Sequence, residues 1–136
     1  MISIREIDHV VLRVRDLARS LAFYRDVLGC PVELERPQIG LWQLRAGRSM
    51  LDLVPVDGKL GSAGGAPPGA QGRNVDHVCL RVDPFVEASI RAHLAAHGVA
   101  AGATEQRVGA EGTGPSIYIE DPDGNVIELK GASSAK

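Results

Sequence analysis

An internal repeat of seven residues is the feature that most constrains the fold of this 136-residue chain. Residues 8–14 read DHVVLRV and residues 76–82 read DHVCLRV, so six of the seven positions match. The second copy begins 68 residues after the first, which is half the length of the chain. A repeat on this scale indicates two similar supersecondary units rather than one continuous architecture.

A helical pattern follows each copy of the repeat. In residues 16–29 apolar side chains recur at three- and four-residue steps, with Asp16 suited to the N-cap and Gly29 to the end. Residues 83–98 show a similar pattern, with Asp and Pro at the start and Gly at the end. The predicted buried stripes are Leu17, Leu21, Tyr24 and Leu28 in the first helix, and Val86, Ile90 and Leu94 in the second.

Short segments of β-type sequence follow each predicted helix. The stretch 121–125, DPDGN, has the residues of a tight turn and predicts a hairpin between the last two strands. Each half therefore has the order β-α-β-β-β, and the predicted fold class is α+β with two βαβββ modules. The expected strands after the helices are 32–37, 41–46 and 49–56 in the first half, and 99–108, 115–120 and 125–130 in the second.

We expect one domain over residues 1–136, with module 1 at about 4–56 and module 2 at about 75–131. Residues 132–136 would be a C-terminal tail. The intervening stretch 57–74 is rich in Gly, Pro and Ala. Its composition is typical of a flexible linker, but a loop of this length in a small domain can also cover a site.

The bulk composition excludes several function classes. The net charge is −2 and the pI about 6.1, so no basic face is predicted and neither nucleic acid nor membrane is an expected partner. The N-terminus lacks the apolar core of a signal peptide, and no apolar run is long enough to cross a bilayer. Two cysteines, Cys30 and Cys79, are too few for a disulfide framework, which favours a cytoplasmic location.

The repeated segment has one polar face and one apolar face if it forms a strand. His9 and Arg13 share a face with Val11, while the opposite face carries only apolar side chains. The second copy places His77 and Arg81 in the same way, with Cys79 between them as a small apolar filler.

Each half also ends in an apolar strand that carries one carboxylate. Asp52 lies between two leucines, and Glu128 lies between an isoleucine and a leucine. A half-buried carboxylate is costly unless it is ion-paired, hydrogen-bonded or bound to a metal. Asp52 could be only a cross-strand partner, and Glu128 could pair with Arg13 or Arg81. One imidazole and one carboxylate in each half nevertheless favour a shared Zn²⁺, Mn²⁺, Fe²⁺, Ni²⁺ or Co²⁺ site.

Three segments carry a resemblance to a known superfamily: DHVVLRVRDLARSLAFYRDVLG at 8–29, DHVCLRV at 76–82 and SIYIEDPDGNVIELKG at 116–131. Together they resemble the vicinal oxygen chelate superfamily, which includes glyoxalases, bleomycin resistance proteins and extradiol dioxygenases, and among these the uncharacterised glyoxalase-like members. The resemblance implies modules related by pseudo-twofold symmetry around an open barrel-like cleft, and a homodimer. It also implies one divalent metal ion, held by His9, Asp52, His77 and Glu128.

The resemblance further implies a metal-dependent lyase or isomerase that acts on a small oxygenated substrate through an enediolate. Glu128 would move the proton, and Arg13, Arg81 and Tyr118 would contact the substrate. Asp52 stands where glyoxalase I has a glutamate, and Val56 replaces an asparagine expected for glutathione binding.

Two alternatives remain open from the sequence. A ring-cleaving Fe²⁺ dioxygenase needs only two histidines and one carboxylate, which His9, His77 and Glu128 could supply. Tyr118 resembles the site tyrosine of those enzymes, but their additional catalytic histidine has no counterpart here. A metal-free module that sequesters a drug, similar to bleomycin resistance proteins, is the other alternative.

Overall fold

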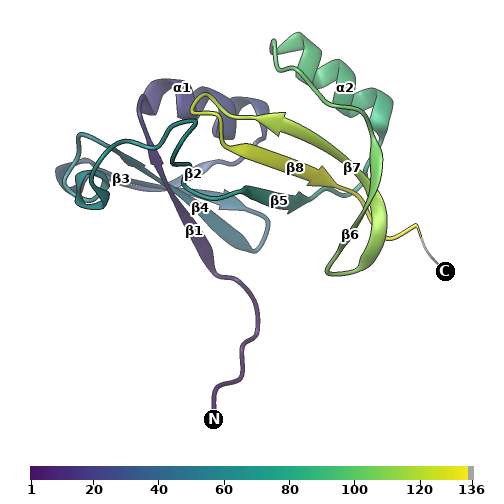
Figure 1. The fold of residues 1–136 in the computed structure, drawn as a ribbon, viewed down its shortest axis with the longest axis horizontal. Helices are drawn as coiled ribbons and strands as arrows, with labels where there is room; N and C mark the ends of the chain where they lie inside the picture. The colour runs from purple at the N-terminus through teal and green to yellow at the C-terminus, as the bar shows by residue number, and fades with distance from the viewer. Residues whose placement is uncertain (135–136) are drawn as a thin grey trace. The chain divides into compact units, whose positions relative to one another are not determined.

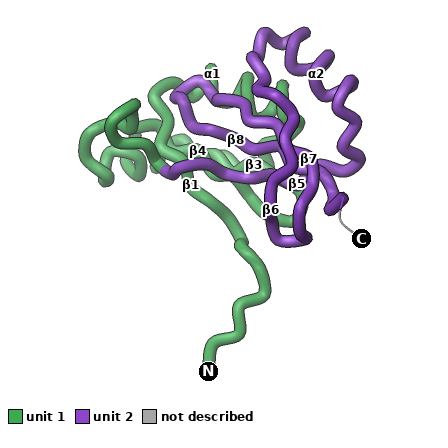
Figure 2. Tube along the Cα trace, turned by 45° about the vertical axis from the view of Figure 1, so that its right-hand side comes forward, with its two compact units in different colours: residues 1–74 green, residues 75–136 purple. Residues whose placement is uncertain are grey.

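The computed structural model describes residues 1–134 and divides the chain into two compact units that meet at Asn74 and Val75 (Figure 2). Each unit contains the predicted β-α-β-β-β order, so the α+β class with two modules is confirmed (Figure 1). Unit 1 contains β1 (His9–Val14), α1 (Leu17–Leu21), η1 (Ala22–Val27), β2 (Val32–Arg36), η2 (Pro37–Ile39), β3 (Leu41–Ala46), β4 (Ser49–Pro55) and η3 (Gly61–Gly64). Unit 2 contains β5 (His77–Arg81), α2 (Glu87–Ala96), β6 (Glu105–Gly109), β7 (Gly112–Glu120) and β8 (Val126–Lys130).

The two sheets have the same topology. In unit 1 the strand order is β1-β4-β3-β2, and in unit 2 it is β5-β8-β7-β6. In both sheets the first and last strands of the module run parallel, and the other neighbours are antiparallel. This arrangement places the histidine strand directly beside the carboxylate strand in each unit.

The strand alternation predicted for the repeat is present in β1. Leu12 and Val14 are fully buried, whereas His9, Val11 and Arg13 are exposed or half-buried. Leu53 on β4 is also fully buried, and α1 packs against β4. Burial of each such leucine contributes roughly 1.5–3 kcal/mol, so this apolar layer fixes which face of the sheet remains available for polar groups.

The first helix differs from a regular α-helix after one turn. Asp16 is the N-cap, as predicted, and accepts a hydrogen bond from the Arg19 amide. From Ala22 the segment is a π-helix, in which the Leu28 amide donates to the Phe23 carbonyl over five residues. Both aromatic residues of η1, Phe23 and Tyr24, are consequently buried, although the α-helical period placed only Tyr24 on the apolar stripe.

Two boundaries predicted in unit 2 are wrong. The helix begins at Glu87 with Val86 as its N-cap, four residues later than the Asp83 start that we expected. Val86 is 48% exposed and does not belong to the buried stripe, whereas Leu94 is fully buried. The strand expected at 99–108 begins only at Glu105. Before it, the Gly102 amide donates to the Tyr118 carbonyl of β7 as a single bond and not as part of a regular ladder.

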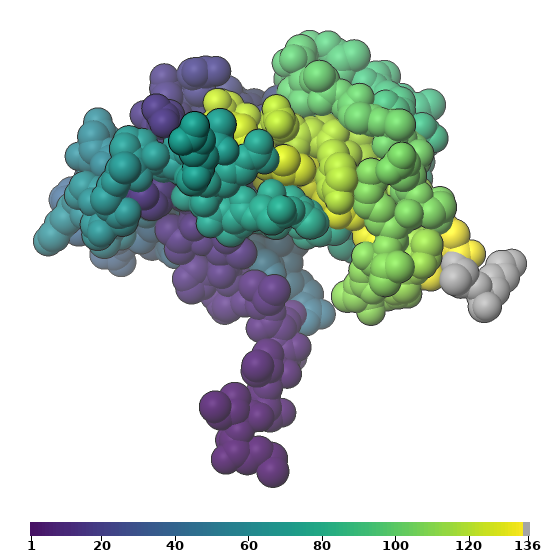
Figure 3. Space-filling model, viewed as in Figure 1, coloured from purple at the N-terminus to yellow at the C-terminus, as the bar shows by residue number. Residues whose placement is uncertain are grey.

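The segment 57–74 belongs to unit 1 and is held by hydrogen bonds. It contains the short helix η3, and its carbonyls accept from Arg13 and Arg15. The N-terminal residues ahead of β1 form no strand and extend from the sheet of unit 1 (Figure 3). No helix within residues 1–134 has both the length and the apolarity to span a membrane. The last two residues of the predicted tail lie outside the described part of the chain.

Candidate functional site

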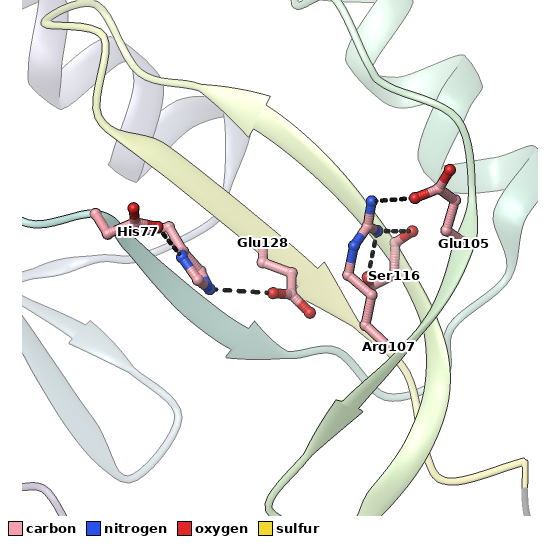
Figure 4. A network of polar contacts seen from close by, with 6 residues as sticks. His77, Glu105, Arg107, Ser116 and Glu128 are labelled. Atoms are coloured by element: carbon pink, nitrogen blue, oxygen red, sulfur yellow. Dashed lines mark hydrogen bonds and ion pairs between the residues drawn. The ribbon is translucent and has the colours of Figure 1, made fainter.

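The unit 2 half-site, which we define as His77 and Glu128, lies on adjacent parallel strands. His77 opens β5, and Glu128 is in the middle of β8, where it pairs in register with Cys79. His77 Nε2 lies 3.3 Å from Glu128 Oε1 (Figure 4). The Glu128 side chain is only 6% exposed, while that of His77 is 35% exposed. The carboxylate therefore lies deep on the polar face of the sheet and the imidazole reaches it from the more open side.

This distance fits two ligands of one metal ion. Two ligand atoms that each lie about 2.1 Å from a divalent ion are separated by roughly 3.0–3.4 Å. This range holds when the ligand–metal–ligand angle lies between the octahedral and the tetrahedral value. The same distance also allows a weak ion pair if the imidazole is protonated. The separation of these two atoms is thus compatible with ligation of one ion.

Tyr118 lies next to this half-site, and its contact with a substrate remains a prediction. It pairs in register with Glu128, and its ring meets the His77 ring edge-on at 5.7 Å between centroids. The Arg107 guanidinium lies 4.0 Å from the Tyr118 ring centroid. It also donates to Ser116 (Figure 4). No motif in the sequence marks Arg107 as a site residue. Its position on the polar face depends on where β6 begins, which the sequence pattern gave incorrectly.

The unit 1 half-site, which we define as His9 and Asp52, occupies the equivalent positions. Asp52 on β4 pairs in register with Val11, the residue two after His9, just as Glu128 pairs with the residue two after His77. Asp52 is 2% exposed. Asp8, which hydrogen-bonds to His9, raises the pKa of the His9 imidazole above its usual value, and the charge of Asp52 raises it further.

One oxygen of Asp52 is buried without a partner. The Gln43 side-chain amide donates to Asp52 Oδ2 at 3.0 Å, whereas Oδ1 has no hydrogen-bond partner among residues 1–134. Leaving a buried charged acceptor unsatisfied costs on the order of 1–3 kcal/mol or more. A metal cation bound to Oδ1 would remove this penalty, so the orphan oxygen fits a metal ligand better than a cross-strand structural role. Gln43 carried no signal in the sequence that set it apart from other polar residues.

The structure thus pairs the four predicted ligands two by two, His9 with Asp52 in unit 1 and His77 with Glu128 in unit 2. Within residues 1–134 no group of three or more His, Cys, Asp or Glu side chains is gathered for a metal ion. That the two half-sites share one ion remains a prediction.

Arg13 was predicted to contact substrate, but its guanidinium is already occupied. Its Nε donates to the Gly61 carbonyl at 2.8 Å, and its Nη atoms donate to the carbonyls of Gly65 at 2.7 Å and Ala66 at 3.0 Å. A Cβ on Gly64 would collide with the same guanidinium. These contacts give Arg13 a clear role in holding the segment 57–74 and leave little of its hydrogen-bonding capacity for an anion.

We expect Arg13→Ala to release the segment 57–74. Hydrogen bonds from a charged donor contribute roughly 1.5–3 kcal/mol, so amide exchange in this segment should accelerate about tenfold or more. Hydrogen exchange read by mass spectrometry measures the effect, and Arg19→Ala on α1 is the matched control. Equal protection of the segment in both variants would contradict the role given to Arg13.

Arg81, the other arginine predicted to bind substrate, forms an ion pair with Glu111 and donates to the Val82 carbonyl. Its side chain is 36% exposed. The pair connects β5 to the turn between β6 and β7. Arg81 therefore has a structural partner in unit 2, while retaining access to solvent.

Cys79 is exposed as a residue, but its thiol is partly buried and has a raised pKa. Burial of the thiol, followed by the charge of Glu128 and a hydrogen bond to it, raises the pKa of Cys79 to about 11. Only roughly one thiol in ten thousand is then ionised at neutral pH, against a few per cent for a free cysteine. In the metal-free protein this disfavours a role for Cys79 as a nucleophile.

We expect iodoacetamide to modify Cys79 about a hundred times more slowly than a free cysteine in chelator-treated protein. Glu128→Gln should accelerate the reaction, because it removes a negative charge that disfavours the thiolate. Peptide mass spectrometry separates Cys79 from Cys30. Identical rates in the wild type and in Glu128→Gln would show that the carboxylate does not control this thiol.

Comparison with known proteins agrees with this architecture. The family model described as Glyoxalase/Bleomycin resistance protein/Dioxygenase superfamily matches residues 6–129. Virulence protein STM3117 of Salmonella typhimurium is 29% identical over 131 residues, covering 93% of this chain and 83% of that protein. Its crystal structure superimposes with a TM-score of 0.78 at 26% identity, over 97% of this chain and all of the other.

Two further relatives carry enzyme names. The mitochondrial methylmalonyl-CoA epimerase of Bos taurus is 27% identical over 132 residues, covering 93% of this chain and 74% of the epimerase. The crystal structure of lactoylglutathione lyase from Agrobacterium tumefaciens gives a TM-score of 0.70 at 27% identity, over 95% of each chain. With both half-sites at matching positions and a family model that spans both units, the chain belongs to the Glyoxalase/Bleomycin resistance protein/Dioxygenase superfamily.

Proposed function

We propose that this protein is a metal-dependent lyase or isomerase that acts on a small oxygenated substrate. One divalent ion would be held jointly by the two half-sites, through His9, Asp52, His77 and Glu128. The observation that carries the proposal is the unpartnered Asp52 Oδ1, buried at the register position that Glu128 occupies in the other unit. The ion would be Zn²⁺, Mn²⁺, Ni²⁺, Fe²⁺ or Co²⁺, all of which accept imidazole and carboxylate together.

When bound, the ion supplies Lewis-acid polarisation of a substrate carbonyl and stabilises an enediolate-type charge. The chain supplies the proton transfer. Glu128 is the candidate general base because its carboxylate lies deep on the polar face, with the His77 ring 3.3 Å away and Tyr118 opposite it on β7. A base in that position can take a proton from the carbon next to the carbonyl and return it to a neighbouring carbon or to the same one.

The relatives support the reaction class. Methylmalonyl-CoA epimerase and lactoylglutathione lyase are by name an isomerase and a lyase, and both are similar to this chain over more than nine-tenths of its length. Glutathione itself is less favoured, because Val56 stands where the glutathione-binding pattern has an asparagine. We further propose a cytoplasmic location and a homodimer. Sedimentation of the purified protein would test the dimer.

The experiment has two parts. Metal analysis of the purified protein should give a stoichiometric divalent ion, and the loaded protein should turn over an α-oxo acid, a hemithioacetal or an acyl-CoA thioester. Absence of turnover with all three classes by metal-loaded protein would contradict the enzymatic proposal.

A ring-cleaving dioxygenase is the second candidate, favoured by one observation, the edge-on contact of Tyr118 with His77. It predicts oxygen uptake with a catechol that is unaffected by Asp52→Ala, because Asp52 is not needed in a three-ligand site. A drug-binding module would instead hold its ligand equally well in the presence of a chelator. An oxygen electrode and a binding assay with chelator separate both from the first proposal.

A further inference from the structure

We propose that Asp8 and Asp76 are positioning residues, each of which holds the neighbouring histidine with its Nε2 atom free to bind metal. The inference rests on the proposed function, since it concerns how the ligands of that site are prepared. It concerns residues that are neither ligands nor substrate contacts.

The same contact occurs in both units. Asp8 Oδ1 lies 2.7 Å from His9 Nδ1, and Asp76 Oδ1 lies 2.6 Å from His77 Nδ1. An ionised carboxylate can only accept a hydrogen bond, so Nδ1 must be the donor in each contact. In the neutral ring the other nitrogen, Nε2, then carries the lone pair. The aspartates thereby select one of the two imidazole tautomers.

The selected nitrogen is the one that faces the acidic ligand in unit 2. His77 Nε2 is the atom 3.3 Å from Glu128 Oε1, while Nδ1 of the same ring is engaged by Asp76. The two nitrogens are thus divided between a holding carboxylate and a ligand carboxylate. A ring turned over by half a revolution would lose both contacts, so the hydrogen bond to Asp76 also fixes the ring orientation.

A role in folding accounts poorly for these aspartates. The Asp8 side chain is 90% exposed and that of Asp76 is 97% exposed. The partner in each contact is the next residue in the chain, so neither contact joins distant segments of the fold. Both aspartates nevertheless open the repeated segment at equivalent positions, in two halves whose sequences differ at most other places. What the two share is the effect on the histidine.

Such outer carboxylates raise the basicity of the ligating nitrogen and fix its direction, and their loss typically lowers metal affinity roughly 10- to 100-fold.

The first experiment needs no metal. Long-range ¹H–¹⁵N spectra of chelator-treated protein, recorded where both imidazoles are neutral, report which nitrogen carries the proton. We expect Nδ1–H for His9 and His77 in the wild type, and a shift toward Nε2–H for His9 in Asp8→Ala and for His77 in Asp76→Ala.

The second experiment measures affinity. Co²⁺ titration of Asp8→Ala and Asp76→Ala should give a dissociation constant roughly 10- to 100-fold higher than that of the wild type. The matched control is Asp26→Ala, which removes an exposed aspartate that contacts its own neighbour, Arg25, at 2.8 Å. This control should bind Co²⁺ as the wild type does.

The two readouts separate failure of this inference from failure of the proposed function. A wild type that binds no metal would overturn the metal site, whatever the tautomers. Unchanged tautomers in the alanine variants, or unchanged Co²⁺ affinity in a protein whose wild type binds it, would overturn the positioning role of Asp8 and Asp76 while leaving the four ligands in place.

Discussion

His77→Ala is expected to abolish stoichiometric metal binding. The substitution removes one of four proposed ligands and leaves Glu128 buried with neither the ion nor the imidazole beside it. Loss of an outer partner already lowers affinity roughly 10- to 100-fold, so loss of a direct ligand should exceed a hundredfold. Elemental analysis of the purified variant, followed by Co²⁺ or Zn²⁺ titration, measures the change.

The matched control is His93→Ala, which removes a histidine from α2 in the same unit. The His93 ring lies 4.5 Å from the His97 ring at a tilt and outside both half-sites, so the variant should retain full metal content. Equal metal content in the two variants would mean that His77 is a structural histidine, and the four-ligand proposal would fail with it. Catalytic turnover, once a substrate is known, should follow the metal content of the two variants.

Asp52→Asn is expected to have opposite effects in the metal-free and metal-loaded proteins. Without metal, the carboxylate has a buried oxygen that no donor in the described part of the chain reaches. Replacing it by a neutral amide removes the buried charge, and the amide oxygen can still accept from Gln43. The amide NH2 would then occupy the place of Oδ1, but a neutral amide costs less to bury than a carboxylate, so the free energy of unfolding should rise by about 1 kcal/mol. With metal, the same change removes an anionic ligand and should weaken binding at least tenfold.

Denaturant unfolding in chelator measures the first effect, and Co²⁺ titration measures the second. Asp57→Asn, at an exposed aspartate of the same unit, should change neither. A metal-free Asp52→Asn protein that is less stable than the wild type would show that the carboxylate is satisfied within the fold, and Asp52 would then be a structural partner rather than a ligand. If Asp52→Asn is more stable than the wild type only without metal, Asp52 serves metal binding and lowers the stability of the metal-free protein.

The two half-sites differ in what lies opposite their acids. Asp52 and Glu128 occupy the same register relative to their histidines, but only Asp52 has an amide donor, Gln43, on the neighbouring strand. The position opposite Glu128 is instead Tyr118. Gln43 holds one oxygen of the shorter side chain, so under the proposed function the unit 1 half-site would present the other oxygen to the ion.

The sequence by itself determined the architecture and the candidate ligands. The repeated DHV segment, the alternation along β1 and the single acid within each apolar strand predicted the two modules, and placed His9, Asp52, His77 and Glu128 on polar faces. These features depend on local periodicity and on the cost of burying a charge, which are properties that a sequence displays directly.

Tertiary structure alone decided which partners those side chains have. Arg13 bonds to carbonyls about 50 residues further along the chain, and Gln43 reaches Asp52 across a strand pair whose register the sequence does not fix. The change from α-helix to π-helix at Ala22 likewise accompanies the burial of both Phe23 and Tyr24. Packing rather than helical propensity decides such a change. Side-chain hydrogen bonds depend on where distant backbone segments end, and no local pattern carries that information.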